Sequence, residues 1–256
     1  MEKYIDIYNE KEKCNIKAKI FENENNKKSN SIFIFCHGFC SSKESKSVTT
    51  VAHKLLKYGV SSIAFDFPGH GDSIQGADKL RVRVCISYLD SVVNYVKEIY
   101  GEDTKISFFA ISFGSYILLN KLIGDKFYYN NIVLRSPAFN MKDILIDALI
   151  KEPFEKYKKN GKAKAGFGGK IEVTYSFYED LIKNDLYTNY NEKRKILVIQ
   201  GALDDTAPIE DTYIFIKNRP DIELIKVENV KHHMEPKELD LVSDIMIEKL
   251  NLIKLT

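Results

Sequence analysis

Short, continuously apolar runs alternate with longer segments of helical periodicity along most of the chain. Such runs are typical of strands buried on both faces of a parallel sheet, and they occupy residues 31–36, 60–66, 105–110, 131–135, 195–200 and 222–227. Between them, apolar residues recur every three or four positions, which predicts helices over residues 47–58, 81–100, 113–123, 208–217 and 236–250. This alternation predicts an α/β fold with a mostly parallel, twisted sheet and helices on both faces.

Two regions depart from this rhythm. Residues 4–8 and 14–21 are expected to form an antiparallel pair at one edge of the sheet. Residues 138–190 contain helical pieces but no core-quality strand, so we expect an inserted cap there, with residues 1–137 and 191–256 forming the core. Within the cap, residues 156–170 contain several glycines and six lysines but no acidic residue, which predicts an exposed hairpin or loop. The lysines are Lys156, Lys158, Lys159, Lys162, Lys164 and Lys170. They could attract an anionic substrate, although a solvated loop is the simpler interpretation.

Composition narrows the class of protein without identifying it. A chain of 256 residues with 44% hydrophobic residues fits one large α/β domain. The net charge of +2 gives no reason to expect a nucleic-acid partner, and no stretch approaches the roughly 18 apolar residues of a membrane span. The amino terminus lacks the apolar region of a secretory signal, so a chain that begins there is expected to be cytoplasmic, whereas one from which a signal had been removed would look the same. A homodimer is compatible with the sequence, which does not determine the oligomeric state.

The strongest chemical signal lies where a buried strand turns sharply into a helix, in the stretch Phe-Ala-Ile-Ser-Phe-Gly-Ser at residues 109–115. A serine at such a turn is pushed out above the strand ends, so Ser112 is a candidate nucleophile. The tight turn requires small residues two positions before and after the serine, and Ala110 and Gly114 meet that need. The simpler alternative is a serine that only caps the helix.

A second loop offers hydrogen-bond donors near the same place. The strand at residues 31–36 ends in His37 and Gly38, and the loop can present the backbone N–H of Phe39 beside that of Phe113. Two such donors would hold the oxyanion of a tetrahedral intermediate. His37 is expected to brace this loop and not to take part in the chemistry.

Acid and base candidates follow two later strands. Asp204 and Asp205 come after the strand at 195–200, where either could instead cap the helix that starts at residue 208. His232 and His233 follow the last predicted strand. A metal site at this histidine pair is disfavoured, because the acidic and cysteine ligands it would need do not gather nearby.

All four loops follow strands that are predicted to be parallel. Ligands in open α/β sheets bind outside the carboxyl ends of the strands, so Phe39, Ser112, Asp204 and His232 are expected to meet at one edge. Their order of serine, acid and histidine is the order of the hydrolase elbow arrangement.

With these residues in place, the chain resembles the α/β-hydrolase superfamily over nearly its whole length. The matching motifs are His-Gly-Phe at 37–39, Asp-Phe-Pro-Gly-His-Gly-Asp-Ser at 66–73, Ala-Ile-Ser-Phe-Gly at 110–114, Gly-Ala-Leu-Asp at 201–204 and Lys-His at 231–232. Within the superfamily it resembles capped bacterial carboxylesterases of the feruloyl and cinnamoyl esterase kind, and the related monoacylglycerol-lipase and serine-aminopeptidase-like group.

The resemblance implies a role for each position. Ser112 corresponds to the nucleophile, Asp204 to the acid by its spacing from Gly201, and His232 to the base. The amides of Phe39 and Phe113 correspond to the oxyanion hole. Ala110 departs from the pattern, because the family usually has glycine there.

The function implied is hydrolysis of small-molecule carboxylic esters with short or aromatic acyl groups, through an acyl-enzyme and without a metal or organic cofactor. Four aromatic residues of the cap would either line an aromatic acyl pocket or fill the cap's own core: Phe139, Tyr175, Phe177 and Tyr178. A thioesterase, a monoacylglycerol lipase or a peptidase would use the same three residues. A non-catalytic binding protein of this fold is less favoured, because all three residues are present.

Overall fold

The computed structural model describes residues 1–22, 31–166 and 168–252, and its main feature is a sheet of eight strands. The strand order is β1-β2-β4-β3-β5-β6-β9-β10. Their bounds are β1 (Glu2–Asn9), β2 (Cys14–Phe21), β3 (Ser31–Cys36), β4 (Ser61–Phe65), β5 (Lys105–Ile111), β6 (Ile132–Arg135), β9 (Ile196–Gly201) and β10 (Ile222–Val227). The first two strands form an antiparallel edge, as expected, and the pairs from β4 to β10 are parallel.

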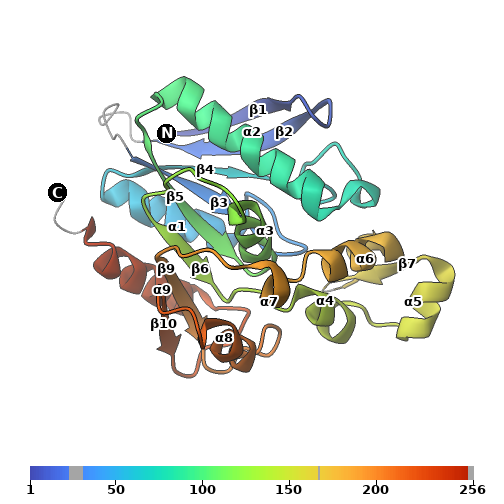
Figure 1. Ribbon diagram of the computed structural model, residues 1–256. Helices are drawn as coiled ribbons and strands as arrows, with labels where there is room; N and C mark the ends of the chain where they lie inside the picture. The colour runs from blue at the N-terminus through green and yellow to red at the C-terminus, as the bar shows by residue number, and fades with distance from the viewer. Residues whose placement is uncertain (23–30, 167, 253–256) are drawn as a thin grey trace.

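Helices cover both faces of this sheet (Figure 1). They are α1 (Lys46–Lys57), α2 (Val82–Tyr100), α3 (Phe113–Leu122), α4 (Met141–Ile144), α5 (Phe154–Asn160), α6 (Tyr175–Lys183), α7 (Leu186–Asn189), α8 (Ile209–Ile216) and α9 (Pro236–Lys249), with a 3₁₀ turn η2 (Ala77–Lys79) and a π-helical turn η3 (Leu145–Leu149). Buried residues of α2 and α3 belong to one apolar cluster, and those of α1 and α9 belong to a second. The α/β fold predicted from the sequence is therefore confirmed.

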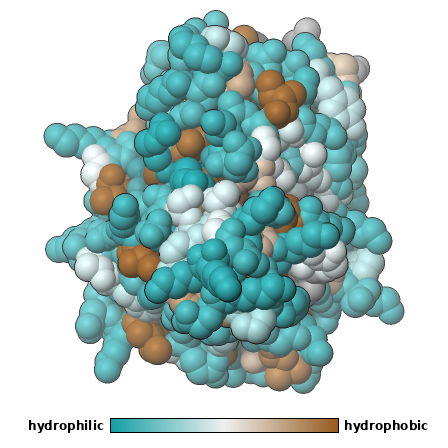
Figure 2. Space-filling model, turned by 90° about the vertical axis from the view of Figure 1, so that its right-hand side faces the viewer, coloured by the Kyte–Doolittle hydropathy of each residue, from teal (hydrophilic) through white to brown (hydrophobic). Residues whose placement is uncertain are grey.

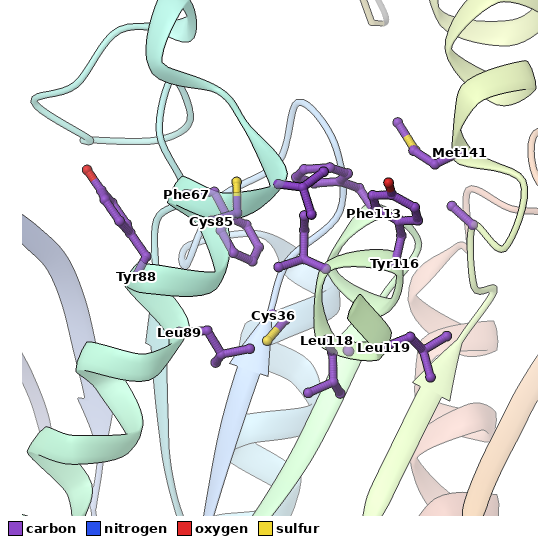
Figure 3. Packing of buried hydrophobic residues seen from close by; sticks show 14 of the residues in the cluster. Cys36, Phe67, Cys85, Tyr88, Leu89, Phe113, Tyr116, Leu118, Leu119 and Met141 are labelled. Atoms are coloured by element: carbon purple, nitrogen blue, oxygen red, sulfur yellow. The ribbon is translucent and has the colours of Figure 1, made fainter. Parts of the chain in front are cut away.

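Strand β3 shows why its sequence is continuously apolar. Ile32, Ile34 and Cys36 belong to the cluster under α2 and α3, whereas Phe33 and Phe35 belong to the cluster under α1 and α9. In Figure 3, Leu89 of α2 and Leu118 of α3 lie on either side of Cys36, within the first cluster. A strand between two helical layers must be apolar at every position, because successive side chains point to opposite faces.

Residues 138–190, between β6 and β9, hold α4, η3, α5, α6, α7 and a two-stranded antiparallel hairpin of β7 (Lys162–Ala165) and β8 (Ile171–Thr174). Figure 1 shows these elements gathered on one side of the main sheet. Alternate hairpin residues are buried, among them Ala163 and Val173. The hairpin expected for the glycine- and lysine-rich stretch is therefore present in its second half, with one packed side, whereas Lys156, Lys158 and Lys159 lie on helix α5, which the sequence did not predict.

The surface is dominated by polar groups on the face shown in Figure 2, where hydrophobic side chains are scattered. None of the helices in the described part of the chain is both long and apolar enough to cross a membrane.

Candidate active site

Ser112 lies at the turn between β5 and α3, in a strained backbone conformation. Its φ is 49° and its ψ is −114°, a region that residues with side chains rarely occupy. The Ser112 N–H donates to the carbonyl oxygen of Arg135 on the neighbouring strand, at 3.0 Å. The side chain is largely buried, at 7% exposure. This is the geometry of a nucleophile elbow, a sharp turn from strand to helix with the serine in a strained conformation at its apex.

The elbow packs so closely against β3 that the position two residues after the serine, Gly114, cannot hold a larger residue. A β-carbon on Gly114 would lie 2.2 Å from the carbonyl oxygen of Cys36, which is backbone and cannot move aside cheaply. Ala110, two residues before the serine, is fully buried, and its carbonyl oxygen accepts a hydrogen bond from Ser115 Oγ at 2.9 Å. The methyl group that departs from the usual glycine is thus accommodated in the core.

The loop after β3 lies directly against the serine. A β-carbon built on Gly38 would be 3.5 Å from Ser112 Cβ, and Phe39 lines the same cavity as Ser112. Phe113 is the first residue of α3, so its N–H has no acceptor within the helix. The two backbone groups expected to form an oxyanion hole therefore belong to segments that meet at Ser112.

His37 braces this loop, in agreement with the expectation. Its Nε2 accepts from the N–H of Phe67 at 3.1 Å, so Nδ1 carries the proton and donates to the Gly38 carbonyl oxygen at 2.8 Å. Burial lowers the pKa of His37 to about 4, which keeps the ring neutral. Both ring nitrogens are occupied by backbone groups, which leaves none for proton transfer.

A buried ion pair holds the next part of the loop. Lys43 Nζ donates to Asp66 at 2.7 Å and to Asp72 at 2.6 Å, and the Lys43 N–H donates to Asp66 at 2.8 Å. Asp66 also accepts from the Asp72 N–H at 2.9 Å. A β-carbon on Gly71 would lie 2.4 Å from the Asp66 carboxylate, so this turn needs glycine there. The Asp-x-x-Gly-x-Gly signature thus ties the turn after β4 to the loop after β3.

Asp204 and His232 form a buried hydrogen-bonded pair. His232 Nδ1 lies 2.9 Å and 3.0 Å from the two carboxylate oxygens of Asp204. Burial alone would raise the pKa of Asp204, but the hydrogen bond and charge of His232, with the N–H groups of Ala207 and Thr206, hold it below its usual value. The carboxylate therefore accepts, Nδ1–H donates, and Nε2 of His232 remains the acceptor nitrogen.

The neighbouring candidates are placed differently. Asp205 is exposed and lies 3.8 Å from Lys231 in a surface ion pair. His233 is exposed and its ring meets that of His232 edge to face, at 5.5 Å between centroids. Asp204 and His232 are thus the acid and the histidine that share a buried hydrogen bond.

Ser112 and His232 line the same small cavity, of about 100 Å³. Its apolar wall comes from Met141, Ile144 and Leu149 on α4 and η3. The described part of the chain contains no group of three or more histidine, cysteine or acidic side chains arranged to hold a metal ion.

The four cap aromatics do not line this cavity. Phe139 stacks on Phe215 at 4.0 Å, and Phe177 packs against Phe39 and Phe113. Tyr175 and Tyr178 pack against each other and Phe154 instead. Tyr175 and Tyr178 thus fill the cap's own core, whereas Phe139 and Phe177 pack the cap against the rest of the domain, which neither interpretation anticipated.

Arg135, which was not among the residues predicted for the site, also lines the cavity. Its Nη1 donates to the carbonyl oxygen of His232 at 3.0 Å, and its own carbonyl oxygen accepts from Ser112. A lone charged residue at the carboxyl end of an otherwise apolar strand was the available signal, because that is where ligands bind in such sheets.

Known proteins share the fold of this chain. Residues 27–198 match the sequence profile of the family described as serine aminopeptidase, S33. Est1E from Butyrivibrio proteoclasticus, solved with ferulic acid bound, superposes with a TM-score of 0.80 at 18% identity, covering 96% of this chain and 99% of that one. A putative hydrolase from Agrobacterium vitis S4 gives 0.76 at 16% identity over 98% of both chains, and mouse alpha/beta hydrolase domain-containing protein 10 gives 0.75 at 16% over 100% of both. No curated protein sequence matches the chain.

Proposed function

This chain belongs to the serine aminopeptidase S33 family of α/β-hydrolases, and from that premise we propose that it hydrolyses short carboxylic esters through an acyl-enzyme on Ser112. One observation carries the proposal. Ser112 and His232 line one cavity, and His232 is fixed by a carboxylate that leaves its second nitrogen available. A hydrogen bond from Nδ1–H of the histidine to a carboxylate fixes the tautomer in which Nε2 can act as the general base.

In the proposed reaction, Ser112 Oγ attacks the ester carbonyl carbon while His232 Nε2 takes the hydroxyl proton. The negative charge on the carbonyl oxygen is held by the N–H groups of Phe39 and Phe113. His232 then gives the proton to the departing alcohol, and Asp204 stabilises the imidazolium while it exists. A water molecule repeats these steps on the acyl-enzyme, which releases the acid and restores the serine.

We assign residues 138–190 as the cap that limits substrate size. Met141, Ile144 and Leu149 from this segment wall the cavity. The hairpin also contacts the loop after β3, since Cys40 Sγ lies 3.7 Å from the carbonyl oxygen of Ala165. A cavity of about 100 Å³ favours acyl groups of a few carbons over long chains.

Labelling with a fluorophosphonate probe tests the nucleophile. The wild-type protein should be labelled, and Ser112→Ala should not. Ser115→Ala is the matched control, because Ser115 is a buried serine of the same turn whose hydroxyl bonds to a backbone carbonyl. Labelling that survives in Ser112→Ala would refute the assignment.

A panel of p-nitrophenyl esters tests the substrate class. We expect kcat/KM to be highest for acetate and butyrate and to fall by at least about tenfold for chains of ten or more carbons, because the extra methylenes do not fit the cavity. The corresponding p-nitroanilides and thioesters should react more slowly. Preferential cleavage of long chains or of amides would exclude the short-chain ester assignment.

A further inference from the structure

Arg135 is a buried cation in the wall of the candidate active site. It is the last residue of β6 and is 5% exposed. Its backbone carbonyl oxygen holds the N–H of Ser112, and its Nη1 holds the carbonyl oxygen of His232, each at 3.0 Å. The guanidinium therefore lies within the same small region as the proposed nucleophile and base.

The charge on this side chain is incompletely compensated. Arg135 Nε has no hydrogen-bond partner among the described residues, and the guanidinium bonds to a neutral carbonyl group. Burial lowers the pKa of Arg135 to about 10, which still leaves it positive at neutral pH, and Asp204 is the acid whose charge favours that state. The Asp204 carboxylate, however, already accepts from His232, Thr206 and Ala207.

A buried guanidinium with an N–H that lacks an acceptor destabilises the protein unless a bound group supplies that acceptor. Burying a charged group whose hydrogen bonds are incomplete destabilises the fold, and an apolar residue at the same position of the strand would avoid that cost. Among the residues that the structure describes, no acidic side chain lines the cavity, whereas Arg135 and two histidines do. The cavity thus presents a cation to whatever enters it.

We propose that the substrate is a short ester that carries a carboxylate a few atoms from the scissile carbonyl, and that Arg135 binds this carboxylate. A guanidinium offers two parallel N–H groups that match the two oxygens of a carboxylate. The small volume restricts the anion to a compact group on a short chain, of the size of a succinate half-ester. This inference rests on the proposed esterase function and adds the chemical class of its substrate.

Two matched pairs of esters test it on the wild-type protein. Ethyl hydrogen succinate and ethyl levulinate differ only in a carboxylate against a methyl ketone on the acyl side. Acetoxyacetate and acetoxyacetone differ in the same way on the alcohol side. Acid release in a pH-stat should show at least about a tenfold higher kcat/KM for the anionic member of one pair, and that pair identifies the side. Equal or lower values for the anionic member in both pairs would overturn the proposal.

Variants separate binding of the anion from support of the histidine loop. Arg135→Gln should abolish the preference for the anionic ester, and Arg135→Lys should retain part of it because the charge remains. Lys164→Gln, on the exposed side of the hairpin, should leave the preference unchanged. If Arg135→Gln lowers both members of a pair by the same factor, Arg135 only positions His232 and the proposal fails.

Binding without turnover keeps the two proposals distinguishable. In Ser112→Ala, calorimetric titration should detect the anionic member of the preferred pair, and adding Arg135→Gln should remove that binding. A wild-type protein that neither reacts with fluorophosphonate nor cleaves esters would refute the esterase proposal. If Ser112→Ala nevertheless binds the anionic ester, the anion site stands. Equal binding of the anionic and ketone esters would refute the anion site alone.

Discussion

Two buried histidines follow strands of the same sheet, His37 after β3 and His232 after β10, and their surroundings differ in kind. His37 is fully buried, and both its ring nitrogens bond to backbone groups. His232 is 6% exposed, bonds to a carboxylate through one nitrogen and lines a cavity with Ser112.

The comparison shows that burial does not distinguish a structural histidine from a candidate base. The partners do, because a nitrogen held by a backbone N–H or carbonyl cannot exchange protons with a substrate, whereas a carboxylate on one nitrogen raises the basicity of the other. The region around His37 is expected to contribute stability, and the region around His232 is expected to contribute catalysis.

The largest expected effect separates His232 from its neighbour. His232→Gln should lower kcat/KM for a short ester by at least about 10³-fold, since it removes the proposed base. His233→Gln should change it by less than about tenfold, because this ring is exposed, whereas His232 is the buried ring that shares a hydrogen bond with Asp204. A larger loss in His233→Gln than in His232→Gln would reverse the assignment.

The next effect concerns the stability of the region around His37. Lys43→Met leaves Asp66 buried without its cation, and should lower the free energy of unfolding by about 3–5 kcal/mol in urea denaturation. Lys54→Met is the control, because Lys54 pairs with the exposed Asp240 and Asp244, and should cost less than about 1 kcal/mol. Similar losses in the two variants would contradict a special role for the buried pair.

The smallest effect is a pH dependence of stability. Burial lowers the folded-state pKa of His37 to about 4 and that of His70 to about 3. In the unfolded chain both titrate near 6.5, so the unfolded state binds more protons below that pH. The free energy of unfolding should therefore be at its full value above pH 6.5 and fall as the pH drops, by up to about 1.4 kcal/mol per pH unit for each histidine.

Urea titrations between pH 6.5 and 5 would measure this slope, above the range in which carboxylates titrate. His70→Asn removes one of these two groups and should make the slope shallower. A stability that stays constant over this range would show that the two rings are not held neutral by burial.

Much of the fold was predictable because its strands are buried on both faces. In a run such as residues 31–36, every residue after Ser31 is apolar. Each predicted core strand and helix is present, with ends that differ by two residues or fewer. The candidate loops were predictable for a related reason, since parallel strands bring their carboxyl ends together whatever the side chains do.

The remaining features depend on contacts between distant residues. Arg135 and His232 are 97 positions apart, and nothing local to either residue indicates that they bond. The aromatics of residues 138–190 could not be placed for the same reason. The sequence around Phe177 would be the same whether its ring faced a cavity or packed on Phe39, as it does. The hairpin did have a local signal, since Lys-Ala-Lys-Ala at 162–165 and Ile-Glu-Val-Thr at 171–174 alternate polar and apolar residues as half-buried strands do.

The π-helical turn in the cavity wall has an evolutionary consequence. The N–H of Ile150 donates to the carbonyl oxygen of Leu145, five residues earlier, so this turn holds one residue more than an α-helical turn. Each residue of an α-helix advances by roughly 100° about the axis, so loss of a single codon here would rotate Leu149 away from its present direction. Ser112, Asp204 and His232 lie on other loops and would be untouched. A one-residue deletion at this turn is thus expected to reshape the cavity wall without altering the proposed catalytic residues.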